Sequence, residues 1–170
     1  MSKEHDYRVT VRWTGNTGSG TATYRGYGRD HDVVADGKPP VRASADPAFR
    51  GTPDRWNPEE LLVASLSQCH MLTYLALCAR AGVVVTDYAD AASGVMREEP
   101  GHTGRFVEVV LRPEVVVAEP GMVERAEALH GQAHEGCFIA RSVDFPVRHL
   151  PVVRPSSVPG DRAAADTPGT

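Results

Sequence analysis

The chain has 170 residues, of which 41% are hydrophobic and 24% charged, so it is long enough to bury one core and resembles ordinary soluble proteins in composition. The 18 Lys and Arg residues are scattered and are outnumbered by 22 Asp and Glu, which argues against a nucleic-acid partner. Three cysteines are too few for the disulfide framework of a small secreted domain, and the polar first residues lack the apolar segment of a secretion signal. We therefore expect a cytoplasmic protein with reduced thiols.

Alternating apolar and polar residues predict strands in the first third of the chain. The alternation covers residues 7–13 and returns over 21–27 after a glycine-rich stretch, which predicts a hairpin. A second pair of short strands is expected within 32–43, on either side of the turn that contains Asp36 and Gly37.

A long helix is predicted next. Asn57 is a typical N-cap, Pro58 suits the first helical position, Glu59 and Glu60 favour the first turn, and Gly82 suits the end. The helix carries no Asp, Glu, Lys or Arg between its acidic start and Arg80, but polar side chains interrupt it, which favours a core helix over a membrane span. It is apolar on nearly every side, and one sheet covers only one face, so we expect a homodimer.

The elements expected after this helix are two strands, a second helix and a last strand, at 83–96, 106–117, 122–135 and 143–150. This order predicts an α+β fold with an antiparallel sheet, and not a doubly wound βαβ fold. Residues 1–150 are expected to form one domain. The tail at 151–170 is rich in Pro, Ser, Ala and Asp and is expected to be disordered.

Helix geometry limits how the cysteines can pair. Cys69 and Cys78 are separated by about 900° of rotation and roughly 13 Å of rise, so they lie on opposite faces and cannot form a disulfide. Cys137 is therefore the possible partner of either one. Cys78 has apolar neighbours and is expected to be an inert core residue, whereas Cys69 has polar neighbours and is either a reactive thiol or a small core side chain.

A reactive thiolate needs a nearby cation. Arg50 and Arg55, in the loop before the long helix, are the candidates, and Glu59 or Glu60 could hold the guanidinium in a bidentate ion pair. Glu59 lies about three turns below Cys69, so it would act on the sulfur only through an arginine placed between them.

Asn57-Pro58-Glu59, the ten-residue step to Cys69 and the later Gly136-Cys137 resemble the OsmC/Ohr family of osmotically induced and organic-hydroperoxide-resistance proteins. The resemblance in element order runs from Tyr7 to Leu150. It implies an intertwined α+β homodimer in which antiparallel sheets wrap around two long central helices, with two active sites at the interface.

The resemblance also implies a thiol peroxidase without a metal or other cofactor. Cys69 matches the peroxidatic cysteine, Cys137 the resolving cysteine and Glu59 the carboxylate that holds the catalytic arginine. Arg50 occupies the position expected for that arginine, with Arg29 or Arg55 as alternatives. The implied substrate is an organic hydroperoxide, and an external dithiol such as a lipoylated protein would reduce the Cys69–Cys137 disulfide.

Two other functions remain open from the residues alone. His130, His134 and Cys137 recur at i, i+4 and i+7 on one helix face, and Cys69-His70 could add further ligands to a metal ion. Alternatively, the cysteines are inert and the chain is a non-catalytic dimer or a small-ligand-binding protein.

Overall fold

The computed structural model describes residues 3–101 and 103–157 and has an α+β architecture. The elements are β1 (Thr10–Trp13), β2 (His31–Val34), β3 (Val41–Ala43), α1 (Pro58–Arg80), β4 (Val85–Asp90), β5 (Ser93–Glu99), β6 (Thr103–Leu111), β7 (Pro113–Val117), α2 (Val123–Gly136), β8 (Val147–His149) and β9 (Val152–Pro155). They fall into two compact units, Met1–Leu62 and Val63–Thr170. The division falls within the first turns of α1.

The first unit contains a three-stranded antiparallel sheet in the order β1-β2-β3. The predicted β2–β3 hairpin is confirmed, and Gly37 has the positive φ of 71° that its turn requires. The strand predicted over 21–27 is wrong, because β1 pairs with β2 and that segment forms turns. The backbones of Gly15 and Gly28 approach so closely here that a Cβ on Gly15 would lie 2.1 Å from the Gly28 carbonyl oxygen.

Both ends of α1 are fixed by local hydrogen bonds, as the sequence predicted. The Asn57 side chain accepts from the Glu60 N–H at 2.7 Å, and the Glu60 carboxylate accepts from the Asn57 N–H at 3.2 Å, which forms a reciprocal capping box. At the other end, Gly82 has a φ of 72°, and the Val83 N–H donates to the Cys78 carbonyl at 2.9 Å. This is the Schellman arrangement that ends many helices at glycine.

The second unit contains two three-stranded sheets, in the orders β4-β7-β9 and β5-β6-β8. Each of the two long strands predicted after α1 is divided in two, and the halves belong to different sheets. Asp90 lies at this change, where its carboxylate accepts from the Arg112 N–H at 2.6 Å and from the Ser67 hydroxyl at 2.6 Å. These bonds attach α1 to the point where both strands change sheets.

The last two strands pair in parallel, β8 with β6 and β9 with β7. The prediction of an antiparallel sheet therefore holds for the hairpins and is wrong for these two strands. The last predicted strand, 143–150, is shortened to β8, and a 3₁₀ turn at Ala140–Ser142 precedes it. The tail predicted to be disordered from 151 onward contributes β9, and its part from 158 onward lies outside the described residues.

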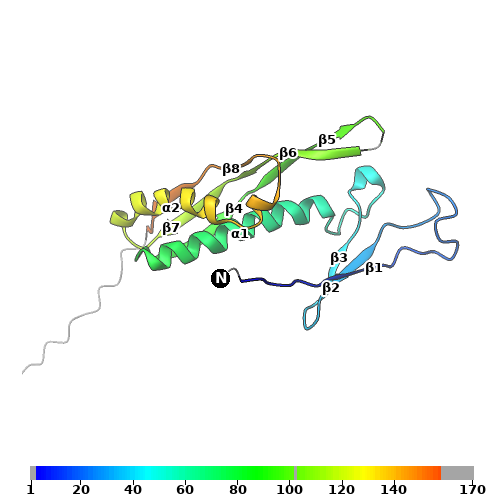
Figure 1. Ribbon diagram of the computed structural model, residues 1–170, viewed down its shortest axis with the longest axis horizontal. Coiled ribbons are helices and arrows are strands. Elements are labelled where there is room, and N and C mark those ends of the chain that lie inside the picture. The colour runs from blue at the N-terminus through cyan, green and yellow to red at the C-terminus, as the bar shows by residue number, and fades with distance from the viewer. Residues whose placement is uncertain (1–2, 102, 158–170) are drawn as a thin grey trace, which may run out of the picture. The chain divides into compact units, whose positions relative to one another are not determined.

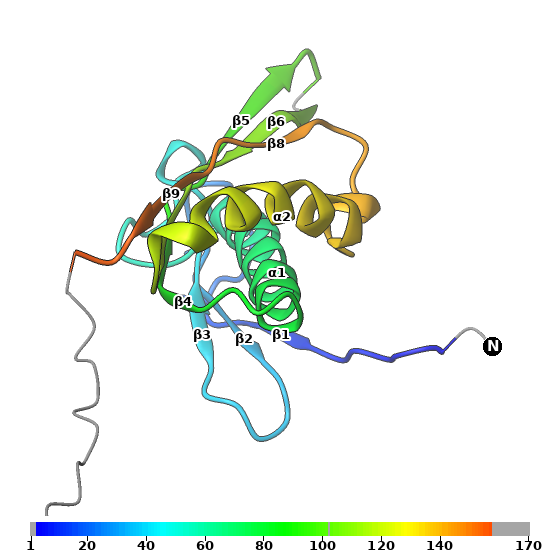
Figure 2. The same ribbon diagram turned by 90° about the vertical axis from the view of Figure 1, so that its left-hand side faces the viewer.

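The core of the second unit lies between α1, α2 and the sheet that contains β7. Figures 1 and 2 both show α2 beside α1. The buried side chains of α1 recur every fourth residue and so form one narrow stripe: Leu66, His70, Tyr74 and Cys78. Cys78 is 1% exposed and belongs to the main apolar cluster, which confirms its predicted place in the core.

The rest of α1 is poorly covered. By length and apolar composition it is long enough to cross a membrane, and 22% of its most apolar window is buried within this chain. Leu72, on the side opposite the buried stripe, is 60% exposed. An apolar helix with this much accessible surface is typical of an element that packs against a partner.

Candidate active site

Cys69 and Cys137 come together in the second unit although 68 positions separate them in the chain. Cys69 lies midway along α1 and is partly exposed, whereas Cys137 follows the last residue of α2 and is buried; both are free thiols. The pKa of Cys137 is raised to about 11, chiefly by burial and also by the hydrogen bond and charge of the adjacent Cys69. Cys137 therefore remains a protonated thiol at neutral pH.

The end of α2 approaches α1 through small contacts. The Thr73 hydroxyl donates to the Cys69 carbonyl at 2.9 Å, which turns the Thr73 methyl toward Gly136. A Cβ on Gly136 would lie 3.3 Å from that methyl carbon, tighter than ordinary van der Waals contact. Gly136 thus lets the end of α2 pack closely against α1 beside Cys137.

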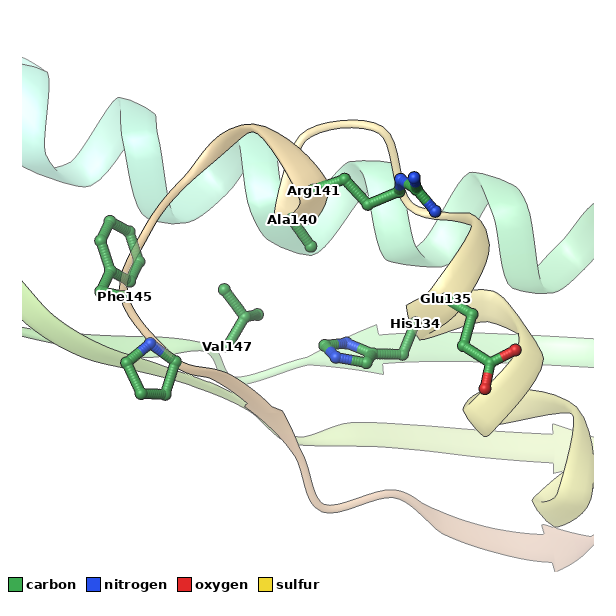
Figure 3. Close-up of a pocket in the computed structure, with 7 residues that line it drawn as sticks. His134, Glu135, Ala140, Arg141, Phe145 and Val147 are labelled. Carbon is green, nitrogen blue, oxygen red and sulfur yellow. The ribbon is translucent and has the colours of Figure 1, made fainter.

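A pocket of about 460 Å³ lies next to the end of α2 (Figure 3). It is lined by His134, Glu135, Ala140, Arg141, Phe145, Pro146 and Val147. The Ala140 N–H in its wall is 3.5 Å from the Cys137 sulfur, and this contact favours the thiolate over the thiol. The pocket is large enough for a small organic molecule and combines an apolar wall with the Arg141 guanidinium.

Four histidines form a cluster beside the two cysteines, and we call His70, His130, His134 and His149 the histidine cluster. The Nε2 of His70 lies 3.0 Å from the Nδ1 of His130. The His149 ring lies between those of His70 and His134, with ring centroids 5.6 Å from His70 and 5.1 Å from His134. Desolvation lowers the pKa of His70 to about 4 and that of His130 to about 3, so both are neutral at physiological pH.

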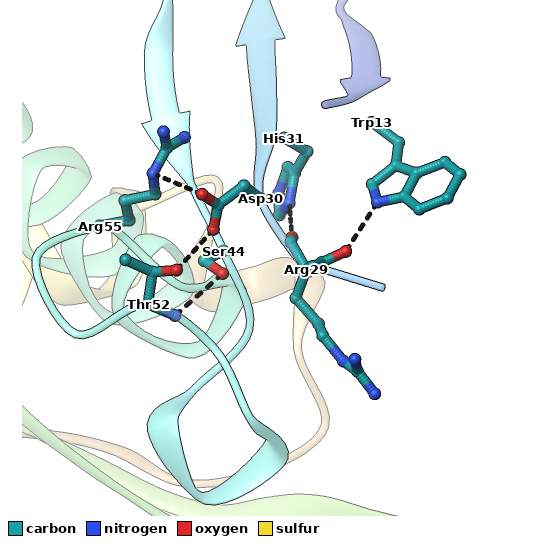
Figure 4. Close-up of polar contacts among 8 residues, drawn as sticks. Trp13, Arg29, Asp30, His31, Ser44, Thr52 and Arg55 are labelled. Carbon is teal, nitrogen blue, oxygen red and sulfur yellow. Dashed lines mark hydrogen bonds and ion pairs between the residues drawn. The ribbon is translucent and has the colours of Figure 1, made fainter. Parts of the chain in front are cut away.

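The first unit holds the predicted arginines and Glu59. Figure 4 shows Arg29, and Arg55 beside Asp30. Arg55 has a side chain 16% exposed, and its Nε lies 3.2 Å from the Asp30 carboxylate. Asp30 also accepts from the Thr52 hydroxyl at 2.7 Å, and this bond is the main cause of its lowered pKa. The Nη1 of Arg55 and the Oε2 of Glu59 are buried without a hydrogen-bond partner among the described residues.

The other two candidate arginines differ from Arg55. Arg50 is exposed and ends the 3₁₀ turn at Pro47–Phe49 with a φ of 69°. The Arg29 guanidinium lies over the rings of Tyr24 and Tyr27 at 4.6 and 4.0 Å from their centroids. Arg55 is thus the candidate that combines burial, a fixed orientation and a free guanidinium N–H group.

Two contacts of the candidate residues, one in each unit, were not found from the sequence. His149 joins the histidine cluster from β8, and Asp30 orients Arg55 from the edge of β2. Nothing in their spacing points to these contacts, because strand pairing creates both. The described residues contain no group of three or more His, Cys, Asp or Glu placed to hold a metal ion.

The comparisons with known proteins agree with this geometry. Residues 51–149 match the family model of the OsmC-like proteins, and the chain belongs to that family. It is similar to an OsmC-like protein of unknown function from Vibrio cholerae, with 33% identity and a TM-score of 0.77 over 88% of this chain and 100% of the other.

Two more distant proteins were also found. An organic hydroperoxide resistance protein from Elizabethkingia anophelis, solved with thiocyanate bound, shares the fold and is 18% identical with a TM-score of 0.63, over 91% of this chain and 100% of the other. The uncharacterized protein YmaD from Bacillus subtilis is 22% identical over 143 residues, which are 82% of this chain and 87% of that protein.

Proposed function

We propose that this protein is a thiol-dependent peroxidase that reduces organic hydroperoxides to alcohols. The proximity of Cys69, a partly exposed thiol, to Cys137, a buried thiol, is the observation that carries the proposal. Family membership supports it, because hydroperoxide-resistance proteins share the fold.

The two thiols suit different steps. Cys69 is the accessible one, so its thiolate attacks the terminal peroxide oxygen, the O–O bond breaks, and the alkoxide takes up a proton and leaves as an alcohol. The resulting Cys69 sulfenic acid condenses with the Cys137 thiol to give a disulfide and water. An external dithiol then reduces the disulfide and is itself oxidised to a disulfide.

The arginine that stabilises the thiolate is assigned to Arg55 in this proposal. Its guanidinium is held by Asp30 and still has a buried N–H group without a partner among the described residues. Glu59, whose Oε2 is also buried without a partner there, is the carboxylate proposed to complete its ion pairs. Arg50, which the sequence favoured, remains the alternative and is compared with Arg55 below.

We further propose that the working protein is a homodimer. The apolar surface of α1 outside its buried stripe requires a cover, and a second copy of α1 related by a two-fold axis would supply one. Sedimentation at micromolar concentration should give a dimer, and a folded monomer would contradict this assignment.

Consumption of thiols tests the reaction. Purified reduced protein should lose two thiols per chain when it is treated with a tertiary alkyl hydroperoxide, and mass spectrometry should find a Cys69–Cys137 disulfide. The Cys69→Ser variant should consume no peroxide, whereas Cys137→Ser should react once and stop as a sulfenate or mixed disulfide. Peroxide turnover by Cys69→Ser, or no thiol loss in the native protein, would favour a non-catalytic dimer.

A further inference from the structure

The contact between His70 and His130 connects the two helices that carry the reactive cysteines. His70 directly follows Cys69 on α1, and His130 lies two turns before Cys137 on α2. Their side chains are 0% and 1% exposed, and one hydrogen bond of 3.0 Å joins them. Tyr74 stacks on His130 with ring centroids 3.9 Å apart and so fixes the ring from the α1 side.

We infer that His70 and His130 are positioning residues: their neutral pair holds α2 against α1, and its protonation releases α2 and separates Cys137 from Cys69. The effect on the Cys69–Cys137 disulfide rests on the proposed function, whereas the opening of the helix pair does not.

The pair keeps its hydrogen bond only while at least one ring is neutral, and it avoids a buried charge only while both are. A neutral imidazole has one N–H and one acceptor nitrogen, so one ring donates and the other accepts. The outer nitrogens, Nδ1 of His70 and Nε2 of His130, are buried and have no partner among the described residues. A first added proton would therefore create a buried cation with an unsatisfied N–H, and a second would remove the acceptor of the hydrogen bond.

The surroundings oppose protonation more than they favour it. The titratable groups that face the pair are Tyr74 on α1, His134 on α2, Asp90 on β4 and His149 on β8. Glu127 on α2 and Tyr88 on β4 interact with Tyr74 and not with the pair itself. Desolvation is the largest cause of the lowered pKa values of His70 and His130, and His149 lowers them further. Asp90 favours the protonated form of His70, but its oxygens already accept bonds from Ser67 and Arg112.

When α2 separates from α1, the burial that opposes protonation of His70 and His130 is lost. Once the imidazoles reach water they bind protons with an ordinary pKa of 6.5, so each proton taken up shifts the equilibrium toward the open form by about tenfold per pH unit below that value. A disulfide between Cys69 and Cys137 should resist the same opening. The two effects are linked: if the disulfide makes proton uptake by the histidines less favourable, then lowering the pH must make the disulfide less stable by the same factor.

Amide hydrogen exchange of α2, corrected for the chemical exchange rate at each pH, measures the opening directly. In the reduced native protein the opening constant should rise at least about tenfold per pH unit between about pH 6.5 and pH 5. His130→Gln supplies an amide that can bond to His70 and does not titrate in this range. In this variant the opening constant of α2 should therefore rise about tenfold less per pH unit than in the native protein. His5→Gln, at an exposed histidine in the other unit, should behave like the native protein.

Comparison of redox states separates this inference from the proposed function. Glutathione disulfide should convert the dithiol to the Cys69–Cys137 disulfide and two glutathione molecules, and α2 should then open at least about tenfold less at pH 5. If no disulfide forms, the proposed function fails while the reduced protein still tests the helix opening. A pH-independent opening constant in the reduced native protein, or an unchanged slope in a folded His130→Gln variant, would overturn the inference.

Discussion

Thr73 and Gly136 touch where α1 and α2 are nearest to the paired cysteines: a Cβ added to Gly136 would lie 3.3 Å from the Thr73 methyl carbon. Cys137 directly follows Gly136, so a larger side chain at this contact would displace Cys137 relative to Cys69. Because Thr73 is also held by its bond to the Cys69 carbonyl, it has little freedom to move away from a larger side chain.

Gly136→Ala should therefore slow disulfide formation in the peroxide-treated protein by several-fold while leaving the first reaction of Cys69 unchanged. Gly131→Ala is the matched control, because Gly131 lies in the same helix and a Cβ there would meet no neighbour within 4 Å. That control should raise the free energy of unfolding by about 0.5–1 kcal/mol through higher helix propensity. Stopped-flow measurement of both steps checks the prediction, and equal rates for the two variants would contradict it.

The three cysteines should respond differently to replacement by serine. Cys78→Ser places a hydroxyl among apolar side chains and next to Tyr74, so it should lower the free energy of unfolding by about 1–3 kcal/mol. Cys69 is partly exposed, and its serine variant should lose turnover with little change in stability. Urea unfolding alongside peroxide assays separates these effects; a stability loss at Cys69 larger than at Cys78 would reverse the assignment.

Conservative replacement distinguishes the candidate arginines. Arg55→Lys keeps the charge but loses the planar guanidinium that bonds to Asp30, so peroxide reduction should fall about 10-fold or more. Arg50→Lys changes an exposed side chain and should leave the rate within about twofold of the native one. Second-order rate constants for an alkyl hydroperoxide give the comparison. A large loss at Arg50 alone would restore the assignment made from the sequence.

Global stability should fall with acid in a defined range. His70 and His130 have ordinary pKa values of 6.5 when unfolded but about 4 and about 3 when folded, so the unfolded chain binds more protons between these limits. The free energy of unfolding should therefore be highest above pH 6.5 and decrease by up to about 1.4 kcal/mol per pH unit for each histidine down to about pH 4. Urea midpoints measured across this range, with His130→Gln for comparison, report the slope.

Local patterns in the sequence determined the helices and their ends. Asn57, Pro58 and Gly82 fixed α1, because caps and positive-φ glycines act through hydrogen bonds within a few residues. The same helix geometry placed Cys69 and Cys78 on opposite faces, and the apolar neighbours of Cys78 predicted that it is buried in the core. The motif that joins Glu59 to Cys69 was enough to predict the family.

Tertiary structure decided what depends on pairing between distant segments. The long predicted strands divide between two sheets at the point where Asp90 accepts from the Arg112 N–H, and β9 pairs with the parallel edge of β7. No local pattern could place His149 beside His70, or show that Asp30 orients Arg55. Those contacts arise only when strands far apart in the chain are brought together, since their residue types are equally compatible with an exposed loop.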